Sequence, residues 1–96
     1  MSCNPQDDPH WVELRSSQVG MNFLRTEVET ALLFASLAFQ ARDSEKRRRN
    51  LQNARKGYDT LRQLVRKLVL TPDERTEMRL KISEVRRQLI TLGESV

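Results

Sequence analysis

Few side chains in this 96-residue sequence have the types and spacing that catalysis requires. The only histidine, His10, lies between Pro9 and Trp11, and nothing in the pattern holds it beside a Ser or Cys nucleophile. The only cysteine, Cys3, excludes an internal disulfide, and its polar neighbours indicate a free thiol in a reducing compartment. The sequence also lacks a glycine-rich phosphate loop and a metal-binding Glu-x-x-His pair. We therefore expect no enzyme, no cofactor and no metal site.

The carboxylates occur where helices place charge that faces solvent. Asp73 and Glu74 follow a predicted helix cap, while Glu27, Glu77 and Glu84 lie beside or opposite apolar stripes. Acid–base catalysis requires carboxyl groups whose pKa is raised by an apolar environment or by a close like charge. No two carboxylates share an apolar face, so the pattern favours a protein that works by contact.

Basic side chains are concentrated between residues 42 and 70, where ten basic groups accompany only three acidic ones. In a helix, arginines placed seven residues apart form a line, and three of them span about 21 Å. Residues 46–49 are four consecutive basic residues at the helix end where the macrodipole disfavours cations, which suggests a purpose other than helix stability. The candidate surface for an acidic partner or a polyanion consists of Arg48, Arg49, Arg55, Lys56 and Arg62.

This basic surface has two interpretations. Its charges could bind an acidic protein partner, nucleic-acid phosphates or an anionic membrane surface. Alternatively, they are solvated and pair with glutamates on neighbouring helices, which are Glu27, Glu29, Glu77 and Glu84. Nucleic acid is the less favoured partner because neither a recognition-helix motif nor a stacking aromatic accompanies the arginines.

Three segments repeat apolar residues at alternating spacings of three and four, which is the period of an amphipathic helix. We expect helices over about residues 18–41, 43–69 and 72–92. The first stripe consists of Met21, Leu24, Val28, Ala31, Ala35 and Ala38. The second consists of Leu51, Ala54, Tyr58, Leu61, Val65 and Leu68, and the third of Met78, Ile82, Val85, Leu89 and Leu92.

The second and third helices carry capping signals. Thr71, Pro72 and Glu74 form a capping box with proline at the first helical position. Gly93 occupies the place of a left-handed C-cap at the other end of that helix. Asp43, or the serine after it, is the predicted cap of the second helix.

The start of the first helix has two candidates. Asp8 can cap a helix that has Pro9 at its first position, or the helix begins at a later cap such as Ser17. In the second case, residues 9–19 form an extra short helix in front of the bundle. Residues 1–8 are expected to be a disordered tail.

The connections between the three helices are only about three or four residues long, so neighbouring helices are expected to run antiparallel. The predicted fold is all-α, an antiparallel up-down-up three-helix bundle in which residues 9–96 form one domain. The longest nearly apolar run, residues 31–39, has about half the length of a membrane span, and residues 1–10 do not resemble a secretory signal. We therefore predict a soluble, cytoplasmic protein.

The first helix carries apolar residues outside its main stripe. Leu33, Phe34 and Leu37 form this second candidate surface, and the stretch around them contains only one polar residue, Ser36. A helix that is apolar nearly all round is covered by other elements. The candidate covers are neighbouring helices of the bundle, the segment Trp11–Leu14 and a second copy of the chain.

One helical pattern resembles known interaction modules. Ala54, Tyr58 and Leu61, followed by Pro72, are similar to the second helix of a tetratricopeptide hairpin, although the second helix here is longer. The three-helix plan with a polar third helix is similar to the microtubule-interacting-and-trafficking bundle. The resemblance implies peptide or helix binding in a groove between helices. We therefore expect a module for protein–protein contact or for self-assembly as a homodimer, with binding of nucleic acid or another polyanion by the basic surface as the alternative.

Overall fold

The computed structural model describes the backbone from residue 9 onward and the side chains from Gln18 onward. Three α-helices follow one another, α1 (Pro9–Gln40), α2 (Ser44–Lys67) and α3 (Pro72–Thr91). The described residues contain no strand, so the predicted all-α class with three helices is confirmed. The predicted tail (residues 1–8) and the Cys3 thiol lie outside the described residues.

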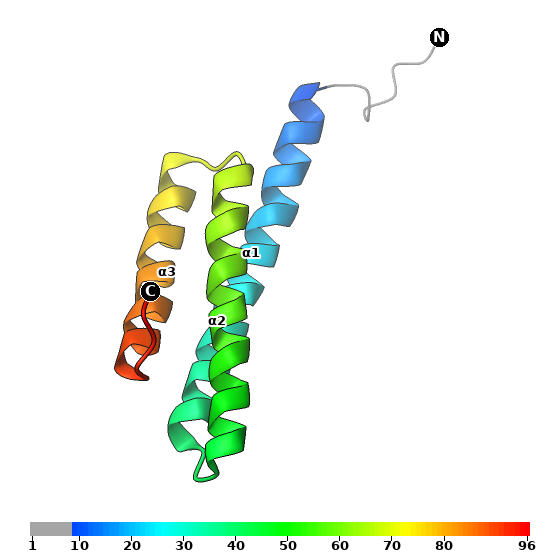
Figure 1. The fold of residues 1–96 in the computed structure, drawn as a ribbon. Coiled ribbons are helices and arrows are strands. Elements are labelled where there is room, and N and C mark those ends of the chain that lie inside the picture. The colour runs from blue at the N-terminus through cyan, green and yellow to red at the C-terminus, as the bar shows by residue number, and fades with distance from the viewer. Residues whose placement is uncertain (1–8) are drawn as a thin grey trace.

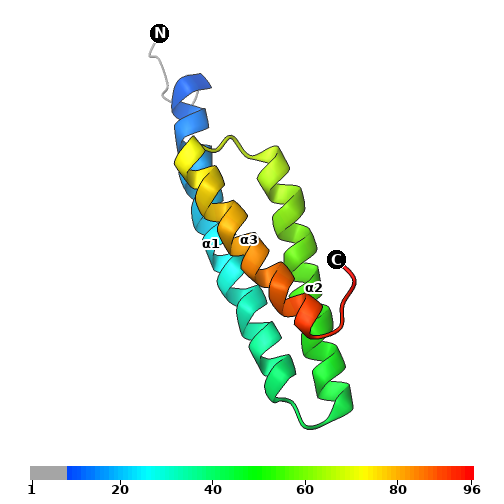
Figure 2. The ribbon, with the colours of Figure 1, turned by 90° about the vertical axis from the view of Figure 1, so that its left-hand side faces the viewer.

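The chain reverses direction at both short connections, so α2 runs back along α1 and α3 runs back along α2 (Figure 1). Figure 2 shows α3 in front of the other two helices, and α3 packs on both of them. The contact between α1 and α2 is the most extensive of the three. The first turns of α1 extend beyond the connection between α2 and α3 (Figure 1).

Of the two candidate starts of the first helix, the structure has the earlier one and not the start near residue 18, because α1 is continuous from Pro9. Residues 9–19 are therefore the first turns of α1 instead of a separate short helix. Gly20 disfavours a helix by about 1 kcal/mol relative to alanine. Tertiary packing compensates for this cost, since a Cβ atom at Gly20 would lie 2.8 Å from Leu68 Cδ1.

The core consists of the three predicted stripes. All six residues of the first stripe are buried, together with Ala54, Tyr58 and Leu61 of the second and Met78, Val85 and Leu89 of the third. α1 and α2 approach each other closely at Gly57, where an added Cβ would be 3.1 Å from the Cβ of Ala31. Leu70, in the connection between α2 and α3, is also buried although no periodic pattern predicted it.

The predicted caps fix both ends of α3. The Thr71 hydroxyl accepts a hydrogen bond from the Glu74 amide at 3.2 Å, and the Glu74 carboxylate accepts one from the Thr71 amide at 2.8 Å. Gly93 has a φ of 97°, and the Glu94 amide donates to the Leu89 carbonyl at 2.9 Å. These contacts form a Schellman motif, which ends α3 and turns the chain back along it.

Candidate functional site

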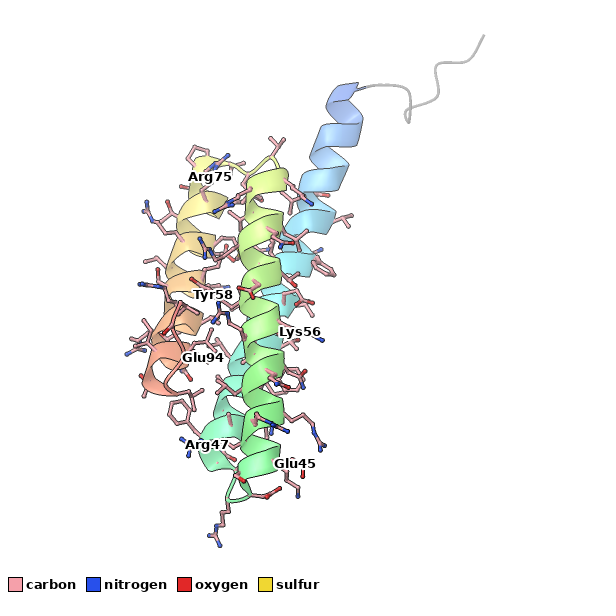
Figure 3. The ribbon with its side chains drawn as sticks, viewed as in Figure 1. Glu45, Arg47, Lys56, Tyr58, Arg75 and Glu94 are labelled. Atoms are coloured by element: carbon pink, nitrogen blue, oxygen red, sulfur yellow. The ribbon has the colours of Figure 1, made fainter. Side chains whose placement is uncertain are left out.

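The predicted basic surface divides between two faces of α2. Tyr58 and Lys56 point to opposite sides of this helix (Figure 3). Arg62 lies on the Tyr58 side, where its guanidinium carbon is 5.7 Å from the centre of the tyrosine ring. Arg49 precedes Lys56 by seven residues and therefore shares its face, where it pairs with Glu45 at 3.6 Å.

Arg55 lies on the face of α2 that looks toward α3. Its Nη1 donates a hydrogen bond to the Ser95 carbonyl at 3.0 Å and lies 3.9 Å from Glu94 Oε1. Its Nε lies 3.4 Å from Asp59 Oδ1, one turn along α2. Arg48, seven residues earlier, is exposed in the second turn of α2. The five predicted residues thus do not form one surface.

Arginines of α3 lie close to this face, and sequence reasoning did not select them. Arg75, Arg79 and Arg86 follow one another at spacings of four and seven, so they share one side of the helix. A hollow of about 420 Å³ lies between α2 and α3. It is lined by Tyr58, Val65, Arg75, Arg79, Ile82, Ser83 and Arg86.

The hollow has an apolar floor, and its three lining arginines come from α3. Tyr58 is buried, while Val65 and Ile82 are partly buried and pack against the core. Arg62 and Arg66 of α2 line a second hollow of about 260 Å³ together with Asp59 and Gln63. We call the first hollow with its arginine neighbours the basic groove, and its residues are Tyr58, Arg62, Val65, Arg66, Arg75, Arg79, Ile82 and Arg86.

Most cations of the basic groove have no carboxylate partner. Among residues 18–96, no ion pair forms at Arg62, Arg66, Arg75 or Arg79. The glutamates proposed to neutralise α2 do not do so within this part of the chain. Glu77 pairs with Arg25 and Lys81 instead, and Glu84 pairs with Arg87. Glu27 and Glu29 have no ion pair among residues 18–96.

The ion pairs of Glu77 join α1 to α3 away from the groove. Its carboxylate accepts hydrogen bonds from Arg25 Nε and Nη2 at 2.8 and 3.0 Å and from Lys81 Nζ at 3.1 Å. These bonds, the Arg25 bonds above all, lower the pKa of Glu77 to about 2. The charges of Glu77, Arg25 and Lys81 therefore neutralise one another and are less available to a binding partner.

The predicted apolar surface is partly exposed. Leu33 and Leu37 are 57% and 38% exposed, whereas Phe34 packs against the core. Their exposed face continues along α1 as a stripe with alternating spacings of four and three, which we call the outer α1 stripe. Its residues are Val19, Phe23, Thr26, Thr30, Leu33 and Leu37.

The segment Trp11–Leu14 does not fold over Leu33 and Leu37. It belongs to the same continuous helix as Leu33, at least about 28 Å away along the axis. The side chains of this segment, and that of His10, lie outside the described residues.

The described part of the chain shows no other kind of site. Among the described side chains, from Gln18 onward, no three His, Cys, Asp or Glu residues are grouped so that they could hold a metal ion. No helix from residue 9 onward is long and apolar enough to cross a membrane. Comparisons with protein-family models, with curated proteins and with solved structures gave no match.

Proposed function

We propose that this protein is a non-enzymatic interaction module that binds an acidic segment of a protein partner in the basic groove. The observation that carries the proposal is the set of arginines on both sides of an apolar floor, four of which have no ion pair among residues 18–96. Guanidinium groups bind carboxylates strongly, often with two parallel hydrogen bonds.

The floor of the groove favours a protein segment over nucleic acid. Tyr58 is only 4% exposed, so its ring is not available for a base to stack on. Val65 and Ile82 offer an aliphatic surface that suits an apolar side chain between acidic ones. Nucleic acid would use charge alone, and the cations on the far side of α2 would then contribute as much as those of the groove.

A pair of matched charge reversals tests the proposal. The groove variant combines Arg62→Glu with Arg79→Glu, and the control combines Arg49→Glu with Lys56→Glu on the other face of α2. Both change the net charge equally. Binding of fluorescent poly-L-glutamate at low salt is measured by anisotropy. We expect the groove variant to bind about tenfold more weakly, since two charge-assisted contacts are lost, and the control to change by less than about threefold.

Two results would overturn the proposal. Equal losses in both variants would show that binding follows the overall charge and has no site in the groove. If the unmodified protein does not bind poly-L-glutamate, the proposal of an acidic partner is wrong. The same comparison with a short DNA duplex identifies the alternative, because a polyanion-binding protein would bind the duplex at least as tightly as poly-L-glutamate.

The outer α1 stripe supports a second candidate function, self-assembly. Its alternating spacings of four and three match the seam of a coiled coil, and Val19, Phe23 and Leu33 are each at least half exposed. In a homodimer joined by this stripe, Leu33→Glu would convert dimer to monomer. Light scattering over a concentration series measures this change, and a strictly monomeric mass of the unmodified protein at high concentration would exclude it.

A further inference from the structure

A segment of the chain itself borders the basic groove. After Gly93 the backbone turns back beside α3, and Glu94 lies between α3 and α2 (Figures 1 and 3). The segment Glu94–Val96 meets Arg55 of α2 and Arg86 of α3. It lies next to the 420 Å³ hollow, because Arg86 also lines that hollow.

Three kinds of contact hold this segment. The Glu94 carboxylate lies 3.9 Å from Arg55, and the Ser95 carbonyl accepts a hydrogen bond from the same guanidinium at 3.0 Å. The Val96 backbone oxygen accepts hydrogen bonds from Arg86 Nε and Nη2 at 3.3 and 3.1 Å. The partly buried Val96 packs against the core. The segment therefore combines an acid, backbone acceptors and an apolar anchor within three residues.

The spacing of the arginines repeats along the groove. Arg62 follows Arg55 by seven residues, as Arg86 follows Arg79, and seven residues of a helix span about 10 Å. A peptide in the extended polyproline II conformation covers about the same distance in three residues, and every third side chain points to the same side. A peptide with one acid in every three residues would therefore place successive carboxylates beside successive arginines.

We propose that the basic groove binds an extended peptide in which an acid and an apolar residue recur every three positions, and that Glu94–Val96 is an internal example of such a ligand. The bound peptide lies over Tyr58, Val65 and Ile82, with carboxylates directed at Arg62 and Arg79. Arg86 contacts Glu94–Val96 and also lines the hollow, so this segment competes with the peptide ligand for Arg86. This inference rests on the proposed function and specifies its partner.

The test uses the whole protein and fluorescent nine-residue peptides. The repeat peptide contains three Glu-Ser-Val units, and its controls replace each Glu by Gln, replace each Val by Ser, or scramble the order. We expect each control to bind at least about fivefold more weakly than the repeat peptide. Arg62→Glu with Arg79→Glu should abolish the difference between the repeat and scrambled peptides, and Arg49→Glu with Lys56→Glu should preserve it.

The competition is tested by removing the internal ligand's contacts. A Glu94→Gln, Val96→Ser double variant should bind the repeat peptide about threefold to tenfold more tightly, because loss of the Glu94–Arg55 pair and of the Val96 packing loosens the segment whose backbone oxygen holds Arg86. Weaker binding would show that the segment supports the groove instead of competing for it. If poly-L-glutamate binding depends on Arg62 and Arg79 but the scrambled peptide binds as tightly as the repeat peptide, the proposed function stands and the extended-repeat inference fails.

Discussion

The two interfaces of α2 differ in how they are filled. Toward α1, small residues bring the helices together, and Gly57 lies so close to Ala31 that an added Cβ would be in tight contact. Toward α3, the helices leave a hollow of about 420 Å³ whose sides are arginines. The first interface is closed by its own side chains, whereas the second presents partly exposed apolar atoms and cations without carboxylate partners.

This difference suggests that some residues of α2 stabilise the fold and others bind a partner. The buried side of α2 supplies stability, because buried aliphatic residues such as Leu61 and Ala54 contribute most of the hydrophobic free energy of folding. The residues at the α2–α3 interface are available for binding a partner, because charged residues at a partly open groove contribute little to the stability of the fold. Substitutions on the two sides of α2 should therefore affect different measurements.

The largest expected effect comes from truncations at two positions of α2, one in the core and one at the groove. Leu61 is fully buried and Val65, one turn further along α2, is partly buried at the groove. We expect Leu61→Ala to lower the free energy of unfolding by about 3 kcal/mol and Val65→Ala by about 1 kcal/mol. Urea unfolding followed by circular dichroism measures both values. Equal losses would mean that the groove floor is as closed as the core.

A larger side chain at the tight contact between α1 and α2 should have the next largest effect on the free energy of unfolding. Gly57→Leu forces α1 and α2 apart at Ala31 and should lower the free energy of unfolding by about 2 kcal/mol. Gly57→Ala is the matched control, since its gain in helix propensity offsets part of the crowding by a single methyl group. A stable Gly57→Leu variant would show that this interface is not tightly closed.

The turn at the end of α3 gives a smaller effect. Gly93 has a φ of 97° and nothing would contact an added Cβ, so the cost of Gly93→Ala is conformational. We expect a loss of about 1 kcal/mol in the free energy of unfolding. Gly93→Asn should lose less, because asparagine tolerates the left-handed region better. Thermal unfolding of the three proteins ranks them, and an unchanged Gly93→Ala variant would contradict the assigned turn.

The smallest effect concerns pH and the Glu77 ion pairs. The pKa of Glu77 falls from an ordinary 4.5 to about 2 in the folded protein, so its stabilisation is complete above pH 4.5 and is lost as the pH falls toward 2. The melting temperature of Glu77→Gln should therefore depend less on pH in this window than that of the unmodified protein. Glu29→Gln is the control, since Glu29 has no ion pair within residues 18–96. Identical pH profiles for the unmodified protein and Glu77→Gln would contradict the role of this ion pair.

Local patterns predicted most of the fold. The three apolar stripes and the caps at Asp43, Thr71 and Gly93 are confirmed, because periodicity and capping depend on residues near one another in the chain. Local patterns left the start of α1 open between Pro9 and a later cap such as Ser17, and α1 begins at Pro9. Helix formation through Gly20 depends on packing against Leu68, which is distant in the sequence.

The basic groove required the tertiary structure. The charges of residues 71–96 balance, which conceals that Arg75, Arg79 and Arg86 share one side of α3. A helical projection of α3 would have revealed this grouping. Which arginines of α2 they accompany depends on the rotation of the two helices, and no local pattern specifies that rotation.

The most direct test of the account is a titration of the whole protein with the Glu-Ser-Val repeat peptide, followed by amide NMR shifts. We predict that the largest shifts occur around Arg62, Val65, Arg79 and Ile82, on the two sides of the basic groove. Shifts confined to Lys56 and Arg49 or to the outer α1 stripe, or the absence of shifts at a saturating peptide concentration, would contradict the groove as the binding site.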